Sequence, residues 1–384
     1  MKLLHIADLH IGKRLNEFSL LEDQKYILQE ILRIVDEVKP LGILMAGDIY
    51  DKSVPAGEAV EVLDEFLTEI FSRQVPLFIV SGNHDSAERI NFGSRIMQKN
   101  GVHIAGTFDG TLKHIVLEDE FGPVNIFLLP FIKPAMVNQY YPDEDIQSYE
   151  EAVNVVINAT HINEGERNIL VAHQFITSGN QQPERSDSET IAIGGLDNID
   201  ASVFKAFDYV ALGHLHGPQS IGRETIRYAG SPLKYSFSET RQHKSVTILE
   251  LVQKGTQDFK IVSLTALRDM REIKGPLEEL VRAGASLAEI SKDYIRAILT
   301  DEGEVYDAIG QLRQVYPNLM RIDFENSRSR QDGHSKTAAS GDVARKSPFE
   351  LFAEFYLKQN NLEMNQEQCL IIQEVLEQIG GVAK

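Results

Sequence analysis

Short apolar runs recur through the amino-terminal part of the chain, and polar residues follow each of them. The runs begin at Leu3, Ile43, Leu77, Ile169 and Tyr209. Runs of this length, bounded by glycine or polar residues, predict strands that are buried on both faces. Because the ends of neighbouring strands meet at one edge of a sheet, we expect the residues after these runs to lie close together.

The stretches between the runs carry apolar residues at spacings of three and four, which predict amphipathic helices. We expect these helices at residues 20–38, 56–72, 86–100 and 149–163. After residue 218 the pattern becomes β-rich, and strands are expected at 225–229, 245–251 and 259–264. Residues 1–265 therefore predict one layered α/β domain with a β-rich closing segment.

The remainder of the chain predicts three further parts. Residues 266–325 indicate a small α+β unit, with helices at 277–283 and 304–316 and strands at 294–299 and 318–324. Residues 326–346 are rich in Ser, Arg, Asp and Gly, which is typical of a flexible linker. Residues 347–384 predict a helix pair, because Ser347, Pro348 and Glu350 form a capping-box pattern and a second helix is expected at 366–379.

The polar residues after the five runs are of the types that bind metal ions. They are Asp8 and His10, then Asp48 and Asp51, then Asn83, His84 and Asp85, then His173, and finally His214 and His216. Taken alone, each cluster is more typical of a turn or a core histidine than of a ligand. Together they supply carboxylate, amide and imidazole groups, which suit a pair of divalent transition metals.

The ordered set D-x-H, G-D-x-x-D, G-N-H-D, an isolated His and G-H-x-H resembles the calcineurin-like metallophosphoesterases. The first motif, Ile6 to Gly12, is similar to that of the nuclease branch, and so are the capping unit, linker and helix pair. The resemblance implies an α/β fold, a β-sandwich flanked by helices. It also implies two Mn²⁺ ions and the hydrolysis of DNA at ends and hairpins, by exonuclease and endonuclease activity, in repair, recombination and replication.

The resemblance also implies a role for each site residue. It assigns Asp8, His10 and His216 to one metal, Asn83, His173 and His214 to the other, and Asp48 to both as a bridge. It makes His84 a catalytic residue that does not bind metal but helps to protonate the leaving 3′ oxygen. We expect Asp85 to orient the His84 ring and Asp51 to support the ligands. The alternative for His84 is a packed turn histidine, and for Tyr228 to Pro232 a simple turn instead of the floor of the site.

Composition limits the partners and the compartment. The formal net charge of −19 argues against a chain that coats nucleic acid through bulk positive charge. No apolar stretch approaches twenty residues, no signal-peptide pattern is seen, and Cys369 is the single cysteine, so we expect a cytoplasmic protein. The resemblance to DNA nucleases implies that it is nucleoid-associated. The sequence has no G-x-x-x-x-G-K-[ST] motif, so any ATPase activity would belong to a partner.

Two contacts with other chains are expected. The apolar face of the helix pair, which includes Phe352 and Phe355, favours docking to the partner ATPase, and the alternative is that it folds back on the nuclease domain. The resemblance implies a homodimer within a heterotetramer, with apolar contacts from the helices at 56–72 and 86–100. The candidates are Phe66, Ile70, Ile90, Phe92 and Ile96. Two rival functions remain open, a phosphodiesterase or phosphatase for small substrates and a non-catalytic scaffold.

Overall fold

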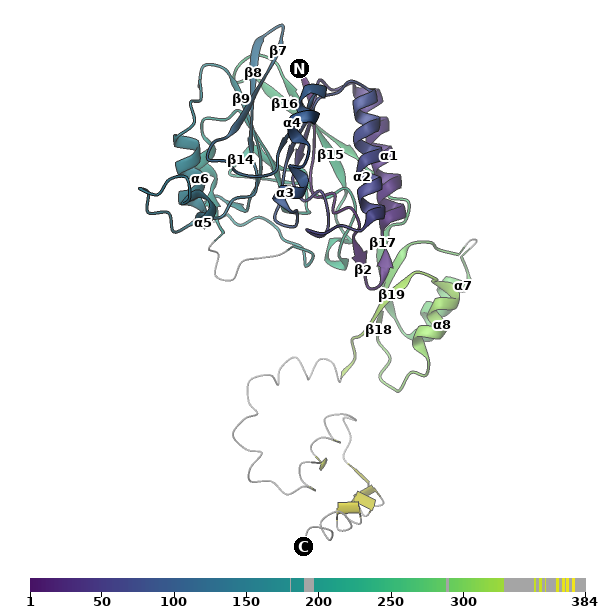
Figure 1. Cartoon of the computed structure of the whole chain (residues 1–384). Helices are drawn as coiled ribbons and strands as arrows, with labels where there is room; N and C mark the ends of the chain where they lie inside the picture. The colour runs from purple at the N-terminus through teal and green to yellow at the C-terminus, as the bar shows by residue number, and fades with distance from the viewer. Residues whose placement is uncertain are drawn as a thin grey trace. The chain divides into compact units, whose positions relative to one another are not determined.

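A computed structural model describes residues 1–327, except 180, 190–196 and 288–289, and isolated positions beyond them (349, 352, 353, 356, 364, 365, 368, 369, 371, 372, 375 and 376). The chain divides into two compact units, Met1–Met270 and Arg271–Lys384 (Figure 1). The predicted linker, apart from residues 326 and 327, and most of the predicted helix pair with its capping box lie outside the described residues. No helix in the described part is both long and apolar enough to cross a membrane.

The first unit contains two six-stranded sheets. The first has the order β16-β15-β1-β4-β5-β6, in which β1, β4, β5 and β6 are parallel and β15 and β16 are antiparallel. Its strands are β1 (Lys2–Ile6), β4 (Ile43–Ala46), β5 (Leu77–Val80), β6 (Val102–Ala105), β15 (Ser245–Leu251) and β16 (Gln257–Ser263). Helices α1 (Leu21–Val38) and α2 (Gly57–Ser72) cover its outer face through residues such as Ile31 and Phe66.

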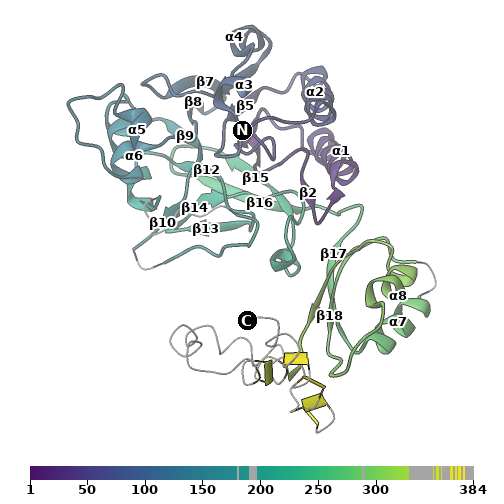
Figure 2. The ribbon, with the colours of Figure 1, turned by 60° about the horizontal axis from the view of Figure 1, so that its bottom comes forward.

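The second sheet has the order β13-β14-β12-β9-β8-β7, with β14, β12, β9 and β8 parallel. Its strands are β7 (Lys113–Asp119), β8 (Gly122–Leu129), β9 (Arg167–His173), β12 (Tyr209–Gly213), β13 (Gln219–Ile221) and β14 (Arg223–Tyr228). Helices α5 (Pro134–Val137) and α6 (Tyr149–Asn158) cover its outer face. Figure 2 shows α1 and α2 on one side of the strands and α5 and α6 on the other.

The inner faces of the two sheets form a shared apolar core. Leu44 and Phe78 from the first sheet pack with Ile126, Val171 and Ala211 from the second, and none of the five side chains is exposed to solvent. Strands buried on both faces are continuous apolar runs, which is why the sequence pattern located them. The predicted β-sandwich flanked by helices is confirmed.

Shorter elements connect these layers. They are β2 (Arg14–Leu15), β3 (Phe18–Ser19), β10 (Ile176–Thr177), β11 (Ile199–Asp200), and the 3₁₀ turns η2 (Ala201–Phe204) and η3 (Phe237–Glu239). The second unit forms a three-stranded sheet, β17-β18-β19, covered by two helices. Its elements are β17 (Met270–Gly275), α7 (Leu277–Ala285), β18 (Tyr294–Leu299), α8 (Ala308–Val315) and β19 (Leu319–Phe324). Leu280, Ile295 and Leu312 form its core.

The structure corrects several predictions. The helices expected at 149–163 and 304–316 are shorter, α6 ending at Asn158 and α8 spanning Ala308–Val315. The single helix expected at 86–100 is broken into α3 (Ala87–Ile90), α4 (Ser94–Met97) and η1 (Gln98–Asn100), with Gly93 in the left-handed region at φ 71° between the first two. Among the candidate dimer contacts, Phe66, Ile70 and Ile90 are buried in the chain's own core, so their assignment to an interface is wrong. Phe92 and Ile96 are 82% and 73% exposed and stay candidates.

Candidate metal centre

The residues expected to bind metal lie at one edge of the sandwich. Strands β1, β4 and β5 of the first sheet and β9 and β12 of the second each end on one of these residues or at most three residues before it. The strands on each side run parallel to their neighbours, so their carboxyl ends share an edge. Loops from both sheets therefore meet, although Asp8 and His216 are separated by more than half of the chain.

The ligand loops have unusual backbone conformations. Asp8, His10, Asp48 and His214 have φ values of 53°, 44°, 49° and 104°, and they are four of the nine non-glycine residues with positive φ in the described part of the chain. Each such conformation costs about 1–3 kcal/mol, and such strain persists where surrounding structure holds it in place. Its concentration on candidate ligands supports a functional site.

One group contains Asp8, His10 and His216, whose ligand atoms lie within 4.8 Å of one another. All three residues are buried, and the Nε2 atoms of the two histidines face each other at 3.1 Å. Asp8 Oδ1 accepts the backbone N–H of His214, but the buried Asp8 Oδ2 has no hydrogen-bond partner. A buried carboxylate oxygen without a partner is costly, and a cation among these three residues would satisfy it.

A second group contains Asn83, His173 and His214. Asn83 Oδ1 lies 3.0 Å from His173 Nε2 and 2.9 Å from His214 Nδ1. His173 Nδ1 donates to the Ala46 carbonyl at 2.8 Å, which leaves the Nε2 lone pair of the neutral ring directed at the site. Asp48 lies between the two groups, because its Oδ2 is 3.3 Å from His173 Nε2 and 3.6 Å from His10 Nε2.

Burial disfavours the charged forms of both the carboxyl and the imidazole groups in this cluster. Burial raises the pKa of Asp8 to about 7 and lowers the pKa of His214 to about 3. Burial also lowers the pKa of His173, but the charge and hydrogen bond of Asp48, the charge of Asp8 and the Ala46 carbonyl together outweigh burial and raise that pKa to about 9. Bound cations would favour ionised carboxylates and neutral imidazoles together, and these are the forms that bind metal. The donor set therefore fits divalent metal ions.

The structure separates the roles of His84 and Asp85. The backbone N–H of His84 donates to Asp48 Oδ1 at 2.9 Å, its Nδ1 lies 3.1 Å from the Asp51 carbonyl oxygen, and its ring centroid lies 4.8 Å from that of His10. The prediction that Asp85 orients this ring is wrong, because the Asp85 carboxylate accepts the backbone N–H groups of Ile49, Tyr50 and Gly82. The Asp51 carbonyl has the expected orienting position instead.

A buried polar network behind His216 was not found from the sequence. His216 Nδ1 lies 2.8 Å from Ser188 Oγ, which donates to Glu239 Oε1 at 2.5 Å. Glu239 Oε2 accepts from Lys244 Nζ at 2.6 Å, and Glu239 is fully buried. Glu189 Oε1 accepts the backbone N–H of His216 at 2.7 Å. These residues stand in no motif, and only their proximity in the fold reveals them.

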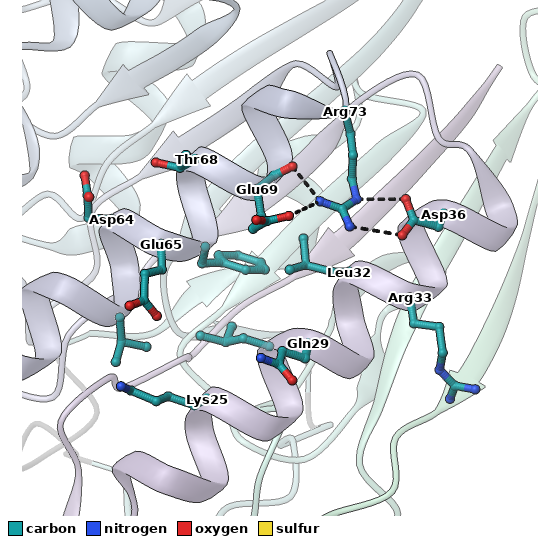
Figure 3. Close-up of a pocket in the computed structure, with 13 residues that line it drawn as sticks. Lys25, Gln29, Leu32, Arg33, Asp36, Asp64, Glu65, Thr68, Glu69 and Arg73 are labelled. Carbon is teal, nitrogen blue, oxygen red and sulfur yellow. Dashed lines mark hydrogen bonds and ion pairs between the residues drawn. The ribbon is translucent and has the colours of Figure 1, made fainter.

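A groove of about 610 Å³ lies elsewhere, between α1 and α2 (Figure 3). Its apolar lining includes Leu32 and Phe66. The Arg73 guanidinium donates to the carboxylates of Asp36 and Glu69, so its charge is already partnered. None of the candidate metal ligands lines this groove, and the strand-edge cluster is therefore the better candidate for chemistry.

Comparisons with known proteins match two parts of the chain to two families. Residues 1–218 match the calcineurin-like phosphoesterase family, and residues 266–360 match the family described as the type 5 capsule protein repressor C-terminal domain. A Staphylococcus epidermidis protein, named as the D subunit of the nuclease SbcCD, is 33% identical over 98% of this chain and 98% of its own length. A Staphylococcus saprophyticus protein of the same name is 34% identical, over 85% and 87%.

Among solved structures, a dimetal phosphatase from Danio rerio is similar with a TM-score of 0.41 and 12% identity, over 70% of this chain and 98% of that chain. A similarity of this size supports no further conclusion.

Proposed function

Because the chain belongs to the calcineurin-like phosphoesterases and, within them, to the family of SbcD nucleases, we propose that it is a metal-dependent DNA nuclease. The observation that carries the proposal is the position of Asp48, whose carboxylate lies near His10 of the first ligand group and His173 of the second. In this proposal Asp8, His10 and His216 hold one metal ion, and Asn83, His173 and His214 hold the other. We propose Mn²⁺ as the metal, as the family resemblance implies.

Two bound divalent ions would supply a hydroxide nucleophile and offset charge on the attacking and leaving oxygens of a phosphodiester. The residues of the chain have separate tasks. Asp48 keeps the two ligand groups at one fixed spacing, because its carboxylate contacts His10 and His173. His173 is held by the Ala46 carbonyl in the form that offers Nε2. His84, fixed by the Asp51 carbonyl, is the proposed acid for the leaving 3′ oxygen.

The function is tested with the purified full-length chain on end-labelled duplex and hairpin DNA, in Mn²⁺, in Mg²⁺ and with a chelator. We expect cleavage that requires added metal and is lost in Asp48→Ala. Cyclic nucleotides in parallel reactions test the small-substrate alternative. Preferential hydrolysis of cyclic nucleotides would favour that alternative, and no hydrolysis of either substrate would favour a scaffold.

We also propose that the chain works with an ATPase, SbcC in the naming of its relatives, in a complex that processes DNA ends. The chain carries no G-x-x-x-x-G-K-[ST] motif of its own, which supports a separate ATPase. The proposed docking segment is residues 347–384, and a homodimer within a heterotetramer is the proposed assembly.

Removing residues 341–384 tests the docking segment. All candidate ligands lie before residue 217, so Mn²⁺-dependent cleavage of small single-stranded substrates should survive. Co-purification with the ATPase should be lost, together with any ATP stimulation on duplex ends. A milder variant is Phe352→Asp with Phe355→Asp, which places two charges on the predicted apolar face. Unchanged co-purification of both variants would contradict docking through this segment.

A further inference from the structure

Several cations lie next to the metal centre, each over an aromatic ring. Among the described residues, five Lys or Arg side chains lie over a ring, and three of these rings contact a candidate ligand histidine. Lys133 Nζ is 5.9 Å from the Phe131 centroid, and Phe131 is 6.3 Å from the His173 ring. Arg185 Cζ is 4.2 Å from the Phe175 centroid, and Phe175 is 6.1 Å from the His214 ring.

The third cation differs from these two. Lys13 Nζ is 5.9 Å from the Tyr235 centroid, beside His10, but it also forms an ion pair with Asp51 at 2.7 Å. Its charge is therefore already offset. Within the part of the chain that the structure describes, Lys133 and Arg185 have no carboxylate within ion-pair distance, and Arg185 has one polar contact, with Gln182 at 3.3 Å.

Both cations lie in loops, and both are beside ligands of the second metal position. Lys133 follows β8 and Arg185 follows β10, so the two approach from different loops. Each is separated by a single ring from a ligand of the second metal position, His173 or His214. In a chain with a formal net charge of −19, two exposed cations without a carboxylate partner near one metal position are a local feature that bulk charge does not predict.

We propose that Lys133 and Arg185 bind phosphate groups of a DNA strand next to the scissile phosphate, on the side of the second metal position. This inference rests on the nuclease function proposed above. A polynucleotide carries such phosphates, whereas a small phosphodiester has only the one that reacts. Arg185 lies against its ring at 4.2 Å, so its planar N–H groups remain available at the edge for phosphate oxygens.

The two rings serve mainly as supports in this arrangement. Phe175 is only 4% exposed, so its face is unavailable for stacking a base, and its contact with Arg185 holds the guanidinium in one direction. A long, mobile cation that is held before the ligand arrives loses less side-chain freedom on binding. The strand is therefore recognised here through its backbone charge, without base specificity.

Salt dependence gives a quantitative signature. Each phosphate neutralised by the protein contributes a slope of about −0.7 to log K against log salt for single strands. Loss of one contact should reduce the magnitude of the slope by about 0.7, and loss of both by about 1.4. Affinity for a single-stranded oligonucleotide should fall by up to about fivefold for each residue, the upper end of the range for one exposed charge pair.

The experiment compares Lys133→Gln, Arg185→Gln and the double variant with Lys205→Gln. Lys205 is an exposed cation before β12, at the opposite end of that strand from His214, so its variant controls for charge alone. Two measurements are made on the full-length chain. The first is the salt slope of oligonucleotide binding. The second is the ratio of kcat/KM on the oligonucleotide to kcat/KM on bis(4-nitrophenyl) phosphate, with Mn²⁺.

In Lys133→Gln and Arg185→Gln we expect a lower ratio of kcat/KM on the oligonucleotide to kcat/KM on the small diester, and a salt slope of smaller magnitude. Both quantities should keep their wild-type values in Lys205→Gln. Variants that match the control in both measurements, or that lose both substrates equally, would overturn the inference while the wild type still cleaves DNA. A wild-type chain that hydrolyses the small diester but not DNA would instead refute the proposed function. The two failures are thus distinguishable.

Discussion

Glu239 is the buried carboxylate through which the fold holds His216, and its replacement by glutamine makes a sharp test. Glu239 Oε1 accepts from Ser188 Oγ at 2.5 Å, and Ser188 Oγ lies 2.8 Å from His216 Nδ1. Because the Ser188 hydroxyl donates to Glu239, it accepts the His216 Nδ1–H. That hydrogen bond fixes the tautomer in which Nε2 faces the proposed metal position.

The size of the stability loss depends on the hydrogen bonds that Lys244 retains. Glu239→Gln removes the charge opposite the buried Lys244 ammonium at 2.6 Å, but three neutral acceptors remain at 2.7–2.9 Å. They are the His216 carbonyl, Ser231 Oγ and Gln242 Oε1. We therefore expect the lower end of the cost of breaking a buried pair, about 3 kcal/mol of unfolding free energy. For a unit of this size, that lowers Tm by roughly 6–12 °C.

Metal affinity separates support of His216 from a purely structural role. Loss of an outer hydrogen-bond partner typically weakens metal binding roughly 10–100-fold, and we expect this for Glu239→Gln in calorimetric titration with Mn²⁺. The control is Glu250→Gln, since the Glu250 ion pair with Lys2 at 3.1 Å is about half exposed and should change neither quantity appreciably. If Glu239→Gln lowers Tm but binds Mn²⁺ as the wild type does, the network does not position His216.

A second form of the same test uses Lys244→Met. Combined with Glu239→Gln, it removes both charges, so no ion is left buried and unpaired. The double variant should lose less unfolding free energy than the sum of the two single losses. Strict additivity would mean that the two charges do not interact in the folded protein.

His84→Ala should leave metal content unchanged, because the backbone N–H that binds Asp48 survives, while kcat falls about 10²–10⁴-fold. His173→Ala should lose one metal ion, as measured by elemental analysis. Loss of metal from His84→Ala would refute the role of His84 as a catalytic residue that does not bind metal. Hydrogen bonds from the Arg167 guanidinium hold the pKa of Asp119 well below its usual value. A carboxylate with a lowered pKa in the folded state adds stability above about pH 4 that is lost on further acidification. Asp119→Asn should therefore lower Tm at pH 7 and flatten the fall in Tm between pH 4 and pH 2, and a parallel pH profile would contradict this.

The predictions from sequence succeeded where the physical signal was local. Strands β4, β5, β9 and β12 are buried on both faces, so each contains a continuous apolar run that a single sequence displays. The ends of α1 and α2 were expected within one residue, because their apolar faces repeat with helical spacing. The expected meeting of the ligand loops followed from parallel strands alone, since such strands end at a common edge.

Other features depend on contacts between distant residues, and the sequence does not display them. Gly93 breaks the expected third helix because the chain turns there through a left-handed conformation, although the apolar spacing continues past it. Ser188, Glu239 and Lys244 meet only because two loops fold beside the same histidine. The hairpin of β7 and β8 is a different case, since each strand contains a short apolar run, Ile115–Leu117 and Ile126–Leu129, that is a local signal and could have been used.

A close approach of the two sheets helps to explain why the candidate metal centre lies where it does. A Cβ atom on Gly213, at the end of β12, would lie 1.9 Å from the carbonyl oxygen of Ala46, at the end of β4. Any side chain there would separate the strand ends and, with them, His214 from Asp48. The same Ala46 carbonyl accepts from His173 Nδ1 at 2.8 Å, so a single backbone group sets both the distance between the sheets and the direction of a ligand. The packing of the two sheets and the geometry of the ligands therefore depend on the same contact. Gly213 has no reactive side chain, but the site requires a glycine at this position.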